Sequence, residues 1–336
     1  MEAQRIRMQQ ISRRFFLRTL TCAGSAVAAP LFAADRALGA PGDNPRVTIG
    51  VLRRDGLLLP FASYDGDWSA PWPEPSRAGA LPIGLGDVPK KWWGAAGPDA
   101  EWKAFLAGGD SMQVKLIAPV SVPIFCGTRI ALTTDYRGEP FDRREPTVPK
   151  DGIAVAGGAS VMPISSISPL APDGHAILAA ITDEFNRQEK DASRRFTRWK
   201  HPFSDAERQA RPIKLEAFYR SIPKTPRGEW RTSYVEAVRE FPPGPKDEGC
   251  GLITFARGWV TEESSRKPQI DVGAQIAYCD RADTTFMLPF GTMALGDEVY
   301  WVYQMSSWRD ESYCVTRIRP RDITPVVVVS GGMCPQ

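Results

Sequence analysis

The sequence predicts a mainly β protein of the α+β type, with one helical segment inserted near its middle. Short apolar runs bounded by Gly, Pro, Asn or Asp recur through most of residues 41–336. Two of the first runs end in Asp-Gly, which favours the tight turn of a β-hairpin because that turn needs positive φ. One long stretch alone has helical spacing of apolar residues. We therefore expect a large antiparallel sandwich, a barrel or a propeller-like assembly.

The first strands are expected to form a meander. Residues 47–51 lead to Asp55-Gly56, and residues 57–64 lead to Asp65-Gly66. Pro60 predicts a bulge or a sheet edge in the second run, because proline cannot donate a hydrogen bond to the ladder. Residues 100–106 are expected to be a short helix. Further strands are expected at residues 112–122, 128–134, 213–219, 234–241, 252–261, 270–279, 299–305, 313–318 and 325–329.

The helical insert is expected at about residues 174–210. Ile177, Ile181 and Phe185 recur at helical spacing in a segment that begins near His175. After it, Ser204-Asp205-Ala206-Glu207 has the pattern of a capping box, in which the serine and glutamate side chains satisfy free backbone N–H groups. This second helix is expected to be short, because Pro212 follows it.

Residues 1–40 have the organisation of an export signal. The heptad Ser12-Arg13-Arg14-Phe15-Phe16-Leu17-Arg18 fits six of the seven positions of Ser/Thr-Arg-Arg-any-Phe-Leu-Lys, and Arg18 keeps the charge of the seventh. It resembles the twin-arginine signal. An alanine-rich apolar run follows at residues 20–34. A bilayer-spanning helix needs roughly twenty apolar residues, so we expect this shorter run to belong to a cleaved signal rather than to a permanent membrane span. Small residues at Ala37, Gly39 and Ala40 offer a cleavage site.

The resemblance implies a destination and one transient partner. Twin-arginine signals direct folded proteins to the twin-arginine translocase, so we expect a periplasmic protein, with secretion as the alternative. Contact with a membrane is expected only through an uncleaved signal. Residues 41–336 are expected to form a single exported β-rich domain with a minor boundary at 140–152.

The charge of the chain excludes one class of partner. The whole sequence carries a formal charge of +3, but residues 1–40 hold six arginines and two acidic residues. Residues 41–336 then carry 36 basic and 37 acidic residues, with no run of Lys and Arg. A near-neutral domain of this kind is a poor candidate for binding nucleic acid.

Five cysteines follow the signal. Cys250, Cys279, Cys314 and Cys334 are candidates for up to two disulfides, with three possible pairings, because an exported chain meets an oxidising compartment. Cys126 is expected to be a buried thiol. The spacing of the cysteines matches no zinc or thioredoxin-like motif, so we expect no metal site.

The tryptophan-rich region is the candidate ligand site. Asp65, Trp68, Trp72, Trp92 and Trp93 could form a platform on which a sugar or another small flat ligand stacks, since indole rings bury a large area at little cost in rotamer entropy. The alternative is that these rings cap the end of a β core beneath a long loop.

Catalytic motifs give weaker signals. His175 and His201 have no partner at metal-ligand spacing, Ser160 lacks the closing glycine of a nucleophile elbow, and Ser264 begins a Ser-x-x-Lys pattern in a polar turn. No cofactor motif is present. The leading hypothesis is a ligand-binding or accessory module, because no catalytic constellation can be read from the sequence. The alternatives are a periplasmic hydrolase, perhaps acting on glycans through converging carboxylates, and a subunit that carries an organic cofactor.

Overall fold

The computed structural model describes residues 45–74, 81–142, 147–196, 204–225, 228–243, 251–263, 266–282 and 284–334. The twin-arginine heptad, His201, Cys250 and Ser264 lie outside these residues. Within them the chain is mainly β and its strand pairs are antiparallel, so the predicted fold class is confirmed. The helices of this part of the chain are α3 (Pro172–Arg195), α4 (Asp205–Gln209) and the short 3₁₀ turns η1 (Leu85–Asp87) and η2 (Lys90–Trp92).

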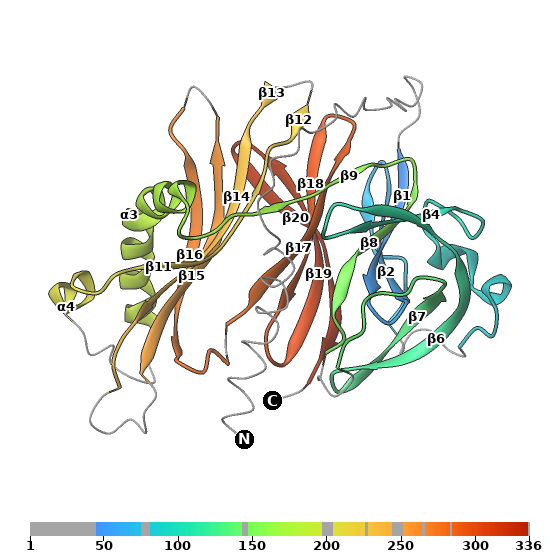
Figure 1. Cartoon of the computed structure of the whole chain (residues 1–336), viewed down its shortest axis with the longest axis horizontal. Coiled ribbons are helices and arrows are strands. Elements are labelled where there is room, and N and C mark those ends of the chain that lie inside the picture. The colour runs from blue at the N-terminus through green and yellow to red at the C-terminus, as the bar shows by residue number, and fades with distance from the viewer. Residues whose placement is uncertain are drawn as a thin grey trace.

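Sheet A contains the first strands of the chain and curls strongly (Figure 1). Its order is β5-β4-β8-β1-β2-β7-β6, and β3 pairs with β2. Lys115 alone separates β5 from β6 in the sequence, although these strands stand at opposite ends of the order. The curl therefore brings the two ends of the sheet together. The strands are β1 (Arg46–Arg53), β2 (Leu57–Asp65), β3 (Trp68–Ser69), β4 (Trp102–Leu106), β5 (Ser111–Val114), β6 (Leu116–Ile124), β7 (Gly127–Thr134) and β8 (Lys150–Gly157).

Two further sheets follow. Sheet B has the order β20-β19-β18-β17-β9 and sheet C the order β10-β11-β14-β15-β16, while β12 and β13 pair separately. Sheet B is built from β9 (Val161–Met162), β17 (Phe286–Leu295), β18 (Glu298–Ser306), β19 (Asp310–Arg319) and β20 (Asp322–Met333). The remaining strands are β10 (Ser165–Ser166), β11 (Lys214–Ser221), β12 (Lys224–Thr225), β13 (Gly228–Glu229), β14 (Arg231–Glu240), β15 (Leu252–Glu262) and β16 (Gln269–Tyr278).

The elements stack in the order α3, sheet C, sheet B, sheet A (Figure 1). Sheets B and C are each covered on both faces by a neighbouring layer. Successive side chains of a strand point to opposite faces, so these strands carry apolar residues on both faces. Three clusters hold the layers together. Ile177, Ile181 and Phe185 of α3 pack on sheet C; Tyr234 and Trp301 lie in the cluster between sheets C and B; and Val47, Phe61, Met293, Val302 and Tyr313 pack between sheets B and A.

Two Leu-Pro-Phe segments make the same deformation in different sheets. The register of β1 and β2 shifts so that Phe61, after Pro60, has no partner, and the register of β17 and β18 shifts in the same way at Phe290, after Pro289. A bulge accommodates a residue that cannot donate to the ladder. Both phenylalanines are buried in the cluster between sheets A and B. The bulge predicted at Pro60 is confirmed.

Local sequence signals explain most of the turns and helix ends. Gly56 and Gly66 both have positive φ, at 86° and 85°, as the Asp-Gly turns predict. The Ser204 hydroxyl accepts the backbone N–H of Glu207, whose carboxylate accepts the N–H of Ser204, so the capping box is confirmed. The helix expected at residues 100–106 was wrong. This segment is β4, in which Trp102 and Ala104 are buried on either side of exposed Lys103, the two-residue alternation of a strand.

The disulfide pattern corrects two expectations. Cys126 is not a free thiol: it lies in the turn between β6 and β7 and is bonded to Cys334, just after β20. Cys314, an expected disulfide candidate, is a free thiol, 4% exposed between sheets B and C, where burial raises its pKa. Cys279 is disulfide-bonded, as expected. Disulfides indicate an oxidising environment of the extracellular type.

Candidate functional site

The predicted tryptophan platform is divided between the two faces of sheet A. Trp72 packs edge to face against both Trp92 and Trp93 in the cluster on the face away from sheet B, and each of the three is less than a tenth exposed. The Trp72 indole N–H donates to the carbonyl oxygen of Ile130 at 2.9 Å. The protein itself therefore covers the faces of these three rings, as the alternative of a capped β core expects.

Trp68 lies on the other face of sheet A, whereas Asp65 lies at the exposed end of β2. The Trp68 ring is half-buried against Tyr64 and Tyr300, with ring centroids 5.3 and 5.1 Å away. Asp65 is exposed and forms an ion pair with Arg46 at 2.9 Å. The five predicted ligand residues thus do not surround a common space.

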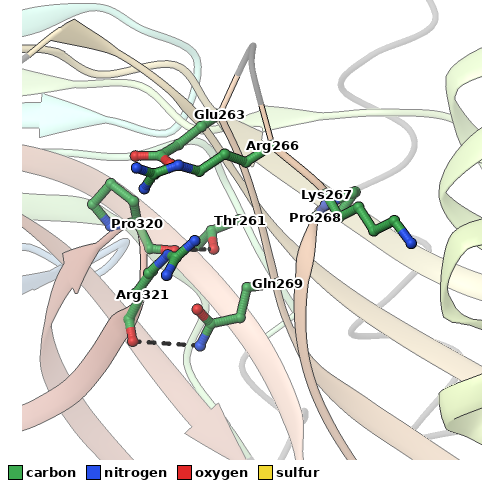
Figure 2. A pocket seen from close by; sticks show the side chains of 8 residues that line it. All are labelled: Thr261, Glu263, Arg266, Lys267, Pro268, Gln269, Pro320 and Arg321. Carbon is green, nitrogen blue, oxygen red and sulfur yellow. Dashed lines mark hydrogen bonds and ion pairs between the residues drawn. The ribbon is translucent and has the colours of Figure 1, made fainter.

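A different set of residues lines a cleft between sheets B and C (Figure 2). The cleft has a volume of about 160 Å³ and opens to solvent. It lies where the turn between β15 and β16 meets the turn between β19 and β20. Its lining residues are Thr261, Glu263, Arg266, Lys267, Pro268, Gln269, Pro320 and Arg321.

Two hydrogen bonds fix the walls of this cleft against each other. The Thr261 hydroxyl donates to the carbonyl oxygen of Pro320 at 2.6 Å, and the Gln269 amide donates to the carbonyl oxygen of Arg321 at 3.4 Å. Both bonds join sheet C to the β19–β20 turn. Because this turn is tethered on sheet C, the Cα of Arg321 is held in place while its side chain remains exposed.

The charges of the cleft are unbalanced. The exposed side chain of Arg266 pairs with Glu263 at 3.1 Å. Arg321 and Lys267 have no ion pair among the described residues, whereas Arg319, on the same hairpin as Arg321, makes two hydrogen bonds to Glu298. Figure 2 shows Arg321 directed toward the space beside Thr261 and the Glu263–Arg266 pair, while Lys267 points away from it. The cleft therefore presents a guanidinium that has no acidic partner within the described part of the chain.

The fully buried acidic residues Glu189, Glu236 and Glu311 have structural partners. Glu189 is paired with Arg239 and accepts the Thr254 hydroxyl, and Glu236 accepts the backbone N–H of Met287. Glu311 lies between Lys150 and the Tyr313 hydroxyl, each at 2.5 Å. Burial raises the pKa of Tyr313, so this phenol stays protonated as a donor.

Glycosidase chemistry needs two carboxylates that face one substrate. The lining of the cleft contains one carboxylate, Glu263. His175 is exposed on α3, and Ser160 precedes the short edge strand β9. The described residues include no group of three His, Cys, Asp or Glu side chains that could hold a metal ion. None of the helices described is long and apolar enough to cross a membrane.

Comparison with protein-family models, with curated proteins and with solved structures finds no match for this chain. Arguments about function therefore depend on the chemistry of the cleft. The cationic residues of the cleft lie in two turns, at Arg266-Lys267-Pro268 and Arg319-Pro320-Arg321, and were not among the predicted site residues. A basic pair beside a proline in each of two hairpin turns is the signal that could have indicated the site.

Proposed function

We propose that this chain is a periplasmic ligand-binding protein whose cleft between sheets B and C takes an anionic group of the ligand. The observation that carries the proposal is the side chain of Arg321, which points into the cleft and has no acidic partner in the described part of the chain. A guanidinium offers five N–H donors in a planar fork that matches a carboxylate, phosphate or sulfate.

The other polar groups of the cleft suit the same ligand. The Gln269 amide that donates to the carbonyl oxygen of Arg321 has a second N–H to offer, and Lys267 adds a positive charge beside the cleft. Arg266 can turn from Glu263 toward an anion at small cost, because exposed ion pairs contribute little to stability. The volume of about 160 Å³ accepts the charged end of a ligand rather than a whole large molecule.

Titration calorimetry with inorganic phosphate, sulfate and acetate tests the proposal. We expect Arg321→Gln to weaken binding of the preferred anion by about tenfold or more, since hydrogen bonds to charged groups contribute about 1.5–3 kcal/mol. Binding should also weaken as sodium chloride is raised, because the site is open to solvent. Lys91→Gln removes the same charge from an exposed position outside the cleft and should leave affinity unchanged. The proposal fails if no anion binds the wild type, or if both variants lose affinity equally.

Export by the twin-arginine route is part of the same proposal. The heptad at Ser12 supports it, and the Cys126–Cys334 disulfide agrees with an oxidising destination. We expect Arg13→Lys combined with Arg14→Lys to leave the full-length precursor in the cytoplasm, as followed by cell fractionation and immunoblotting. Arg18→Lys is the matched control, because lysine is the usual residue there, and it should be exported normally. Export of the twin-lysine variant at the wild-type level would contradict the route.

A further inference from the structure

The free edge of β16 differs from the other sheet edges of the described chain. The strand orders end in β5 and β6, in β10 and β16, and in β20 and β9. A long, regular edge strand can pair with another chain, and proteins block such edges with prolines, bulges or very short strands. β6 contains Pro119 and Pro123, β20 contains Pro325 and register shifts, β9 and β10 have two residues each, and β5 has four.

β16 has none of these blocks. It runs for ten residues from Gln269 to Tyr278, contains no proline, and keeps its register with β15 without a shift. Asp271 is its one charged residue, and it has no lysine. α3 packs on one face of the strand, where Val272 is buried against Ile177 and Ile181. β16 pairs with β15 alone, so its outer edge carries no described strand.

We propose that β16 pairs antiparallel with β16 of a second copy of this chain, so that two copies of sheet C join into one sheet around a two-fold axis near Gly273. A two-fold axis perpendicular to the sheet keeps each face of the strand on its own side of the joined sheet. The proposal does not depend on the anion site.

The sequence of β16 is self-complementary in this register. Ile270 stands opposite Ile276, and Val272 opposite Ala274, on the side that α3 covers. On the other side Asp271 stands opposite Gln275, so no like charges face each other. Pairs of this kind are the unit of sheet stabilisation.

The flanks of the strand are also complementary in charge. Arg266 and Lys267 precede β16 and Asp280 follows it, so antiparallel pairing brings the basic start of each strand toward the acidic end of its partner. The cation Arg281, which follows Asp280, is already held by Glu216 through two hydrogen bonds of 2.6 and 2.7 Å. Sedimentation equilibrium of the mature protein should therefore give the mass of two chains, with dissociation on dilution.

Gly273 allows a substitution that tests the contact without disturbing the fold. A Cβ built at Gly273 meets nothing within 4 Å and its φ is not in the left-handed region, so a side chain fits. Gly273→Lys places two like charges opposite each other at the two-fold axis, and we expect the mass to fall to one chain. Gly86→Lys is the matched control, since Gly86 is exposed in η1 with the same open space, and it should stay dimeric.

Charge reversal makes the test specific. Gly273→Asp alone should also be monomeric, and an equal mixture of Gly273→Asp and Gly273→Lys should recover the dimer mass. The proposal is overturned if the wild type is a monomer at every concentration, or if the folded lysine variant stays dimeric. If circular dichroism shows that the charged variants do not fold, disulfide cross-linking of the Gly273→Cys variant tests the contact instead. Opposed residues in an antiparallel pair lie about 4.5–5.5 Å apart, within disulfide reach, so a cross-linked dimer supports the contact and its absence refutes it.

Discussion

Cys334→Ser is expected to lower the free energy of unfolding by about 5 kcal/mol. The Cys126–Cys334 bond closes a loop with a sequence separation of 208 residues. In the chain-entropy description, a cross-link stabilises the fold by restricting the unfolded chain, and a loop of this size falls at the upper end of the range, about 5 kcal/mol. Urea denaturation under non-reducing conditions measures the effect as a lower midpoint.

The position of this disulfide adds a local consequence. It fastens the β6–β7 turn of sheet A to the end of β20 in sheet B, where Gly332 lies against Ile124 and Phe125. Without the bond, packing is what holds the end of β20 to sheet A among the residues that the structure describes. Amide hydrogen exchange should therefore rise at residues 330–333 in Cys334→Ser before the core of sheet B is affected.

A double-variant comparison separates the cross-link from side-chain effects. Cys126→Ser should cost the same as Cys334→Ser, and the double variant should cost no more than either one, because all three lack the same bond. Met333→Ala changes an exposed neighbour, 61% accessible, and should be nearly neutral. Additive losses in the double variant, or an unchanged midpoint in the single variants, would contradict the assignment.

Most of the secondary structure could be predicted because its signals are local. The Asp-Gly turns, the capping box at Ser204 and the bulge at Pro60 each depend on the conformational preference of one or two residues. β4 was missed for a physical reason. A run of five residues is too short for helical and alternating patterns to be told apart, and tertiary pairing with β8 and β5 decides the outcome.

The cysteine pairing and the cleft could not be predicted, because both arise from contacts between sheets. Cys126 is brought to Cys334 by the packing of sheet A on sheet B. Arg321 meets Gln269 since the β19–β20 turn packs beside the start of β16. The tryptophan-rich region, by contrast, gave a clear signal in the sequence, but that signal has two interpretations. Its composition is compatible with both a binding platform and a packed core, and only the three-dimensional packing decides that Trp92 and Trp93 are buried.

Arg239→Met is expected to destabilise the protein by about 3–5 kcal/mol. Arg239 and Glu189 are 3% and 1% exposed, and their ion pair joins β14 to α3. Arg239 also donates to the side chain of Asn186 at 2.9 Å and to the backbone oxygen of Arg211 at 3.1 Å. Methionine can still pack on the Phe185 ring, over which the Arg239 guanidinium lies, but it leaves the Glu189 carboxylate buried with the Thr254 hydroxyl as its one remaining donor among the described residues. An uncompensated buried charge is costly.

The loss of stability expected for Arg239→Met depends on the burial of the ion pair, and an exposed ion pair serves as the comparison. Lys214 and Glu240 form an ion pair at the surface, at 2.5 Å with both side chains about half exposed, so Lys214→Met should cost less than about 1 kcal/mol. The double variant Arg239→Met, Glu189→Leu should be more stable than Arg239→Met alone, because it removes the unpaired charge. Thermal and urea unfolding measure all three. If Arg239→Met cost no more than Lys214→Met, the ion pair would not be what fixes α3 on sheet C, and the apolar contacts of Ile177, Ile181 and Phe185 alone would account for its docking.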